Sequence, residues 1–440
     1  MTNKVYLVGA GPGDVELITL RGMNVVKNAD VIVYDRLSNP KLLEYAKDSC
    51  EFVYVGKKAN AHTMKQEDIN QLLVDEAKLG KMVVRLKGGD PYVFGRGGEE
   101  GVILNDRGVE FEVVPGISSS IGGLAYAGIP ITYRNIATSF HVFTGHFSNE
   151  DEEHPWEAIS KLKGTLVFLM GMKNLEKIVC NLKSNGLDEG TPVAIVNWAT
   201  RSNQRVVTGN LRDIVDVVKE ENIKAPSLIV VGDVVDLREK LEFFEKRPLY
   251  GQKIVVTRAR AQSSKLVDKL SNLGATVFEY PSIQIREIED NENVEKAMDI
   301  LDDYTHIVFT SINGVNIFFE RLFDRGFDSR DLANSKLIAV GSATKRALRN
   351  YGLNADWMPE NYDGDSLANG LREMLKSDHR VLIPRAKNGR ADLIDSISEV
   401  CKADEVILYE SVVDESNVSE LNETIKKNDI DYITFTSSST

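Results

Sequence analysis

The chain has 440 residues, a mass of 49.0 kDa and a formal charge of −13 at pH 7. This length exceeds what one hydrophobic core usually organises, so roughly two to four domains are expected. The acidic balance disfavours nucleic acid as a partner, because phosphate binding requires a basic surface. An anionic small substrate would require a local basic patch. The start of the sequence lacks a signal-peptide pattern and no run of about eighteen apolar residues occurs, which predicts a cytoplasmic protein without membrane contact.

The cysteines and histidines give no sign of a metal centre. Cys50, Cys180 and Cys401 are isolated, so neither a disulfide framework nor a C-x-x-C site is predicted. The six histidines include no H-E-x-x-H or comparable ligand spacing. We therefore expect no bound metal.

The first predicted strand, VYLVG at residues 5–9, runs into the glycine-rich turn VGAGPGD. A dinucleotide-binding fingerprint requires a third glycine where this chain has Asp14, and Pro12 has no N–H to donate to a phosphate. A phosphate cradle is therefore disfavoured. Two possibilities stay open: a structural turn, which the seven residues alone favour, or a loop that lets the backbone approach a ligand without a phosphate.

Apolar β-branched runs alternate with amphipathic stretches along the whole chain, which predicts an α/β protein with buried sheets. Residues 115–131, rich in glycine and other small residues, predict a close-packed helix between two lobes, a place where ligands bind. The pattern restarts after a charged, proline-containing segment, so the main domain boundary is expected near residues 244–250.

In the second half, each short strand ends in Thr, Ser, Gly or Pro and is followed by a helix where the chain continues. The similar stretches TSING and TSSST predict two similar lobes with a cleft between them. Strand-end hydroxyls and helix N-termini suit a carboxylated ligand. The last strand signal lies directly before Thr440, so we expect that the C-terminal part of this fold is missing from the sequence.

Five motifs of the first half occur in a family-specific order. They are VGAGPGD, YDRL at 34–37, VVRLKGGDPYVFGRGGEE at 83–100, VPGISS at 114–119 and LVFLMG at 166–171. Together they resemble the uroporphyrinogen-III C-methyltransferases, which use S-adenosylmethionine to make precorrin-2. The resemblance covers about residues 1–244 and implies the two-lobed tetrapyrrole-methylase fold, with lobes at about 1–115 and 116–244. This fold is distinct from the common Rossmann methyltransferase fold.

The second half, about 251–440, resembles uroporphyrinogen-III synthase, a two-lobed enzyme that cyclises hydroxymethylbilane with inversion of ring D and loss of water. The motifs that carry this resemblance are less specific than those of the first half; they are VTRAR, FTSINGV, AVGSATKRAL, IPRA and FTSSST. The resemblance implies one lobe from about 251–285 and 408–440, and another from about 286–407. A synthase fused to the methyltransferase would make the substrate of its own neighbour.

The first resemblance implies residues that contact S-adenosylmethionine. They are Pro12, Gly88, Gly89, Asp90, Val93, Ser118, Ser119, Met170 and Ala199. From the residues alone, the alternative for GGD is a turn with a solvated carboxylate, and a methionine is more often core packing.

The same resemblance implies Asp35 as general base for the pyrrole proton and Lys57 as proton donor. Without it, an Asp at a strand end is usually a helix cap, and Lys57 is equally a partner for a substrate carboxylate. Since the substrate carries eight carboxylates, we expect Arg85, Lys87, Arg96 and Arg134 to form a cationic patch. Tyr133 stands where the family usually has His, so any role of that imidazole is in doubt.

For the synthase half, polar strand ends are expected to hold the acetate and propionate groups of the substrate. The candidate contacts are Thr310, Ser311, Gly341, Thr344 and Thr436, with Arg258 and Arg385 either binding substrate or bracing the cleft.

Three alternatives stay open. In the first alternative, the first half would be a methylase of a later corrin intermediate, although YDRL and LKGGDPYVFGRGGEE fit the uroporphyrinogen enzyme better. In the second alternative, the second half would be a two-lobed binding module. In the third, it would be a catalytically inactive scaffold for the methyltransferase. The first resemblance also implies a homodimer; whether precorrin-2 goes to sirohaem or cobalamin is left open.

Overall fold

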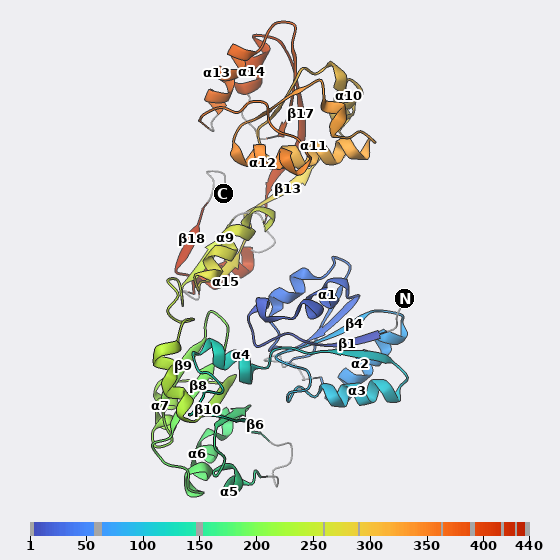
Figure 1. Ribbon diagram of the computed structural model, residues 1–440. Helices are drawn as coiled ribbons and strands as arrows, with labels where there is room; N and C mark the ends of the chain where they lie inside the picture. The colour runs from blue at the N-terminus through green and yellow to red at the C-terminus, as the bar shows by residue number, and fades with distance from the viewer. Residues whose placement is uncertain are drawn as a thin grey trace. The chain divides into compact units, whose positions relative to one another are not determined.

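The computed structural model divides the chain into two compact units, residues 1–252 with 268–276 and residues 253–267 with 277–440 (Figure 1). The structure describes residues 4–56, 64–146, 153–257, 260–288, 291–361, 364–387, 392–414, 418–426 and 429–435.

The first unit begins with a five-stranded, wholly parallel sheet in the order β3-β2-β4-β1-β5. Its strands are β1 (Lys4–Gly9), β2 (Val31–Tyr34), β3 (Glu51–Tyr54), β4 (Val83–Lys87) and β5 (Glu110–Val114). Helix α1 (Leu20–Asn28) packs on one face, and α2 (Gln66–Lys78) and α3 (Gly97–Asp106) pack on the other (Figure 1). Central strand β4 is buried along its whole length, as expected for a parallel sheet covered on both faces.

Helix α4 (Ser119–Tyr126) lies within the small-residue segment for which a close-packed helix was predicted. A Cβ added to Gly123 would lie 2.9 Å from Cβ of Ala199 and 2.9 Å from a methyl of Leu228. The small residues are therefore needed for the close approach of this helix to the second sheet of the unit.

The second sheet of this unit is mixed, in the order β6-β7-β10-β8-β9. Its strands are β6 (Phe140–Thr144), β7 (Thr165–Leu169), β8 (Pro192–Asn197), β9 (Arg205–Asn210) and β10 (Ser227–Val231). β6 and β7 are parallel and the remaining neighbours are antiparallel. The helices of this part are α5 (Trp156–Ile159), α6 (Leu175–Ser184), α7 (Ile214–Glu220) and α8 (Arg238–Leu241).

The second unit contains a small sheet, β12-β11-β18, and a larger one, β13-β17-β16-β14-β15. The strands are β11 (Lys253–Val256), β12 (Thr276–Glu279), β13 (Ile283–Glu287), β14 (His306–Phe309), β15 (Lys336–Ala339), β16 (Arg380–Ala386), β17 (Lys402–Val413) and β18 (Tyr432–Thr434). The helices are α9 (Arg260–Asn272), α10 (Glu292–Asp299), α11 (Ile312–Asp324), α12 (Ser342–Asn350), α13 (Gly364–Met374), α14 (Asp392–Ser398) and α15 (Val418–Lys426).

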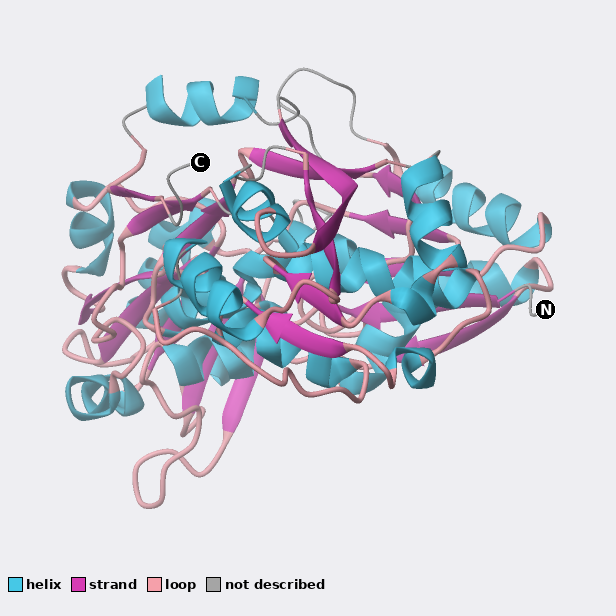
Figure 2. Ribbon diagram, turned by 90° about the horizontal axis from the view of Figure 1, so that it is seen from above, coloured by secondary structure: helices cyan, strands magenta, loops and turns pink. Residues whose placement is uncertain are grey.

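In the larger sheet, the helices α10, α11 and α12 cover one face and α13 and α14 cover the other. β13 pairs antiparallel with the end of β17, so this pairing crosses the lobe boundaries expected near residues 285 and 408. The α/β class predicted from the alternating pattern is confirmed, with helices and strands interspersed throughout (Figure 2).

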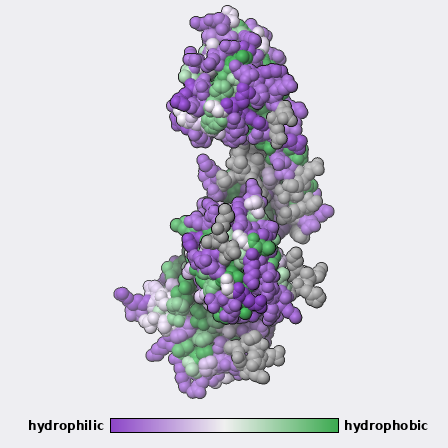
Figure 3. All heavy atoms as spheres, turned by 90° about the vertical axis from the view of Figure 1, so that its right-hand side faces the viewer, coloured by the Kyte–Doolittle hydropathy of each residue, from purple (hydrophilic) through white to green (hydrophobic). Residues whose placement is uncertain are grey.

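The surface of the first unit carries several large apolar side chains, and green apolar spheres gather in the lower part of the view in Figure 3, where this unit lies. Leu20 is 86% exposed and Tyr92 is 57% exposed. No helix within the described ranges is both long and apolar enough to cross a bilayer.

Candidate active site

A cavity of about 640 Å³ lies in the first unit, within the usual size range of small-molecule sites. Its wall is formed by the turn after β1, the loops after β2 and β4, the start of α4, and the segments that follow β7 and β8. All nine residues predicted to contact S-adenosylmethionine line this one cavity: Pro12, Gly88, Gly89, Asp90, Val93, Ser118, Ser119, Met170 and Ala199.

The glycine-rich turn is both a structural turn and part of the cavity wall. The backbones of Gly11 and Gly89 exchange two hydrogen bonds, of 3.2 and 2.7 Å. A Cβ added to Gly9 would lie 2.5 Å from Cα of Gly116 and 2.7 Å from the carbonyl oxygen of Gly89. Three chain segments therefore meet through bare backbone, and no side chain fits between them.

Asp14, in the place of the third fingerprint glycine, fixes this turn through three hydrogen bonds. Its carboxylate accepts from the Glu16 N–H at 3.0 Å and from the Tyr126 hydroxyl at 3.1 Å, and its own N–H donates to Thr200 Oγ1 at 2.9 Å. Burial and the neighbouring Asp14 carboxylate raise the pKa of Tyr126 to about 12. Asp14 therefore holds the turn against the second sheet rather than a phosphate.

Asp90 is a loop anchor as well as a residue of the cavity wall. Its Oδ1 accepts from the N–H groups of Tyr92 and Val93, at 2.8 and 3.2 Å, and its Oδ2 accepts from the Gly116 N–H at 3.0 Å. The carboxylate thus ties the loop after β4 to the start of the α4 segment.

Backbone in the left-handed region is concentrated at this cavity. Phe94, Arg96, Met170 and Trp198 line it with φ between 45° and 59°, and Thr200 follows the lining residue Ala199 with φ of 66°. Non-glycine residues in this region store strain and cluster at functional sites. This distribution supports a ligand-binding role for the cavity independently of the motifs.

A buried ion cluster lies behind the cavity. Glu100 Oε1 is 2.7 Å from Lys87 Nζ and 3.2 Å from Arg85 Nε, and it accepts a hydrogen bond from Gln66 Nε2 at 3.1 Å. Burial, with the nearby Arg85 cation, lowers the pKa of Lys87. Arg85 and Lys87, both predicted to bind substrate carboxylates, line the cavity. They already share the Glu100 carboxylate as a counterion.

Asp35 lines the cavity next to this cluster. Its Oδ2 lies 3.3 Å from Nη2 of Arg85 and its Oδ1 accepts from the Leu37 N–H at 3.0 Å. The side chain is 28% exposed, so the carboxylate is oriented on one side and accessible on the other. Lys57, the predicted proton donor, lies outside the described residues.

The other two predicted substrate arginines differ in position. Arg96 lines the cavity and forms an ion pair of 2.6 Å with Glu99, which lowers the pKa of that carboxyl. Arg134 is exposed and lies outside the cavity lining, as does Tyr133. The structure therefore does not bring Tyr133 and Arg134 together with the predicted residues of the cavity.

The family resemblance did not single out several residues of the cavity and its support, among them Gln66, Glu100, Trp198 and Arg201. Arg201 directly follows the WAT stretch that contains Ala199, so its neighbourhood was the available signal. Counting side chains in the lining, five are Lys or Arg (Arg85, Lys87, Arg96, Lys173 and Arg201) and two are Asp (Asp35 and Asp90). The wall is thus locally cationic in a chain of net charge −13.

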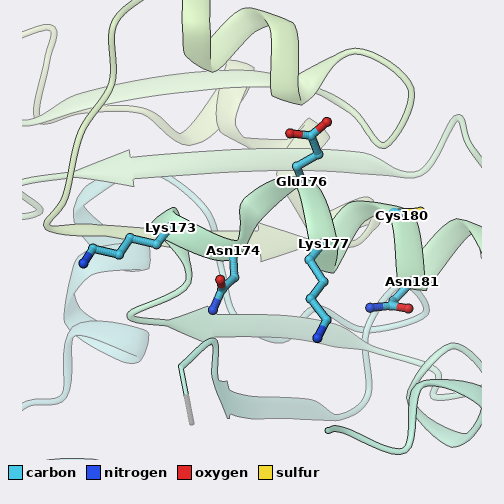
Figure 4. A pocket seen from close by; sticks show the side chains of 6 residues that line it. All are labelled: Lys173, Asn174, Glu176, Lys177, Cys180 and Asn181. Atoms are coloured by element: carbon cyan, nitrogen blue, oxygen red, sulfur yellow. The ribbon is translucent and has the colours of Figure 1, made fainter. Parts of the chain in front are cut away.

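A second, open hollow of about 470 Å³ lies over the beginning of α6 (Figure 4). Its lining consists of Lys173, Asn174, Glu176, Lys177, Cys180 and Asn181. Lys177 pairs with Glu153 at 2.5 Å and Asn174 Nδ2 donates to the Gly145 carbonyl at 2.6 Å. These are the contacts of a solvated helix face.

In the second unit, neighbouring parallel strands bring the predicted polar residues to one edge of the larger sheet. β16, β14 and β15 end near Arg385, Thr310 and Gly341, respectively. Ser311 caps α11, since its Oγ accepts from the Gly314 N–H at 2.9 Å, and it also bonds the Tyr409 hydroxyl at 2.9 Å. Gly341 precedes α12 without a side-chain cap, and Thr344, on α12, is buried.

Arg385 is held by its own sheet. It forms a close ion pair with Glu405 on β17, and its Nη1 donates to the Ala386 carbonyl at 3.1 Å. Its guanidinium therefore already has a counterion, which favours bracing over substrate binding. Thr436 and Arg258 lie outside the described residues.

Comparison with known proteins assigns both halves. The tetrapyrrole (corrin/porphyrin) methylases match residues 4–215, and uroporphyrinogen-III synthase HemD matches residues 264–440. The porphyrin biosynthesis protein HemD of Ruminiclostridium josui is 42% identical over 438 residues, which are 99% of this chain and 87% of that protein. The uroporphyrinogen-III C-methyltransferase of Priestia megaterium is 53% identical over 236 residues, 53% of this chain and 98% of that protein.

A crystal structure of the uroporphyrin III C-methyl transferase from Thermus thermophilus is 39% identical, covering 53% of this chain and 99% of that chain with a TM-score of 0.47. The match to the Ruminiclostridium protein spans nearly the whole chain, and a family model fits each half. The chain therefore belongs to the family of bifunctional tetrapyrrole biosynthesis proteins in which a uroporphyrinogen-III C-methyltransferase precedes a uroporphyrinogen-III synthase.

Proposed function

We propose that the cavity of the first unit binds S-adenosylmethionine and uroporphyrinogen III side by side and transfers methyl groups to C2 and C7, giving precorrin-2. The single observation that carries this proposal is that nine positions, implied by the family resemblance, line one cavity. The nine residues come from five separate segments between Pro12 and Ala199, and a shared ligand accounts for their grouping.

The residues present suit S-adenosylmethionine. A Cβ added to Gly89 would have no atom closer than 3.8 Å, so the backbone there faces open space that a ligand can approach. Helix α4 begins at the lining residue Ser119, and its N-terminal N–H groups favour a carboxylate such as that of the methionine portion. When bound, S-adenosylmethionine supplies a methyl group on a sulfonium centre, which a pyrrole carbon can attack.

Asp35 is proposed as the base that accepts the pyrrole proton. The Arg85 guanidinium keeps its carboxylate in place, and the Leu37 N–H fixes the other oxygen. A base must be held within reach of the proton it removes, and a carboxylate that is oriented yet partly exposed meets this requirement. Alignment of nucleophile, methyl and leaving sulfur supplies the rest of the rate enhancement.

The second unit is proposed to cyclise hydroxymethylbilane, with Thr310, Ser311, Gly341 and Thr344 as contacts and Arg385 as a brace. The convergence of three strand ends on one sheet edge supports this assignment. Gly341 leaves the start of α12 without a side-chain cap, so its N–H groups suit a substrate carboxylate. Thr436 stays a predicted contact.

Two parallel reactions test both halves. The purified protein receives labelled S-adenosylmethionine with either hydroxymethylbilane or uroporphyrinogen III, and dimethylated product is followed. Label transfer from both substrates is expected. Transfer from uroporphyrinogen III alone would make the second unit an inactive scaffold, and transfer from neither would overturn the proposal.

A further inference from the structure

Two arginines lie next to one tryptophan at the cavity. The guanidinium carbon of Arg201 is 4.9 Å from the centroid of the Trp198 ring, and that of Arg36 is 5.6 Å from it. Trp198 and Arg201 line the cavity, and so do Asp35 and Leu37, the residues on either side of Arg36. The two arginines come from different segments, the loop after β2 and the loop after β8.

Neither guanidinium has a carboxylate partner within 4 Å among the residues that the structure describes. Three other basic residues of the wall differ in this respect, because Arg85 and Lys87 share Glu100 and Arg96 pairs with Glu99. The acceptor recorded for Arg201 is the carbonyl oxygen of Leu37, at 3.0 Å from Nη2.

Among the described residues, no carboxylate forms an ion pair with either arginine of this pair. Burial, followed by the proximity of Arg36, lowers the pKa of Arg201. Two like charges near one aromatic ring cost free energy unless an anion lies between or beside them. The ring face orients a guanidinium for a planar, bidentate contact, and carboxylates match that geometry.

We propose that Arg36 and Arg201, oriented by Trp198, form a binding site for a peripheral carboxylate of the tetrapyrrole substrate; this rests on the function proposed above. A carboxylate in this cavity has two sources, the tetrapyrrole and the methionine portion of S-adenosylmethionine. The second source carries an ammonium group beside its carboxylate and a sulfonium nearby, so two unpaired cations favour the first.

The test compares Arg201→Gln, Arg36→Gln and the double variant with the wild type. In each single variant we expect the KM for uroporphyrinogen III to rise about 10- to 100-fold, the loss typical of a charge-assisted hydrogen bond, with kcat within about twofold. The KM of Arg201→Lys should lie between those of the wild type and Arg201→Gln, because lysine keeps the positive charge but lacks the planar guanidinium. Arg107→Gln removes an exposed cation outside the cavity and is the matched control.

Two binding measurements separate the possible results. The affinity for S-adenosylhomocysteine, measured by calorimetry, should stay unchanged; a selective loss there would assign the arginines to the methionine carboxylate and overturn the inference. Binding of uroporphyrin III, a fluorescent octacarboxylate, should weaken in the variants. Unchanged binding of both compounds would reduce Arg201 to a structural contact with Leu37 and also overturn it.

These readouts also keep the inference distinct from the proposed function. A wild-type protein that transfers no methyl to uroporphyrinogen III contradicts the proposed function, while uroporphyrin III binding still decides the arginine site. An active wild type with unchanged KM in the variants contradicts the inference alone.

Discussion

Lys87 Nζ lies 2.7 Å from Glu100 Oε1, and the two side chains are 5% and 0% exposed. The same oxygen lies 3.2 Å from Arg85 Nε, so two buried cations share one buried carboxylate, and Asp35, 3.3 Å from Arg85 Nη2, supplies the second negative charge. Removing one partner of a buried ion pair leaves an uncompensated charge, which costs more than the pair itself contributes. Glu100 is thus the group on which the charge balance behind the cavity depends.

We expect Glu100→Gln to lower the free energy of unfolding of the first unit by about 3 to 5 kcal/mol. Urea unfolding followed by tryptophan fluorescence measures this, since Trp156 and Trp198 lie in the first unit. Glu157→Gln breaks only the exposed pair with Lys161 and should change the free energy by less than about 1 kcal/mol. Equal effects of the two substitutions would contradict the role assigned to Glu100.

Asp35→Asn should lower kcat for methyl transfer about 10²- to 10⁴-fold, the usual contribution of a general base. Asn keeps an oxygen that can accept from the Leu37 N–H, so the loop should stay in place. Rapid-quench measurement of label transfer, with calorimetric binding of S-adenosylhomocysteine, separates chemistry from binding. Asp48→Asn, an exposed carboxylate in the same unit, is the control. A variant with wild-type kcat would exclude Asp35 as the base.

Gly116→Ala should damage the cavity although it removes no functional group. The new Cβ would lie 2.7 Å from Cα of Gly9, and backbone cannot move aside as a side chain can. We expect a loss of about 1 to 3 kcal/mol in unfolding free energy, as for other overpacked sites, together with weaker binding of S-adenosylhomocysteine. Gly98→Ala on α3 is the control, because the added Cβ would have no described atom within 4 Å apart from its chain neighbours and its own helix backbone. This variant should bind S-adenosylhomocysteine normally and unfold no more easily.

The sequence predicted the cavity better than its supporting structure. Residues such as Gly89 and Asp90 follow a strand in a motif that could be recognised, and the structure places them on the wall. Glu100 stands in a GGEE run that reads as a solvated helix start, and only the packing of α3 on the sheet buries it. A charge cluster formed by β4 and α3 has no local signature, because its partners meet through tertiary packing.

Strand pairing in the second unit was predictable only in part. β14 and β15 are short apolar runs and were recognisable, as was β18. β17 has acidic residues at 404, 405 and 410, on either side of the apolar stretch VILY at 406–409, and its C-terminal part pairs with the largely exposed strand β13. Only four of its twelve positions therefore form the continuous apolar run typical of a buried strand. The pairing of β13 with β17 therefore had no clear signal in the sequence.

His306 gives the second unit a pH-dependent stability. Its side chain is buried, its Nε2 has no hydrogen-bond partner among the described residues, and its Nδ1 is 2.9 Å from Thr305 Oγ1. Burial, then the nearby His379 and Lys336, lower its pKa to about 4, while Asp356 opposes the shift. Since the folded-state pKa lies below the unfolded value of 6.5, the unfolded chain binds more protons between these values, and stability falls as pH falls from about 6.5 to 4.

At about 1.36 kcal/mol per pKa unit, the loss across this window should reach about 2 to 3 kcal/mol. The urea midpoint reported by Trp357, with Trp156 and Trp198 replaced by Phe, follows the second unit alone. His306→Gln should flatten the pH dependence of this midpoint, because no buried imidazole then has to be charged. His141→Gln, in the first unit, should leave it unchanged. An equally steep dependence in His306→Gln would assign the proton uptake to other groups, because Gln cannot titrate in this range.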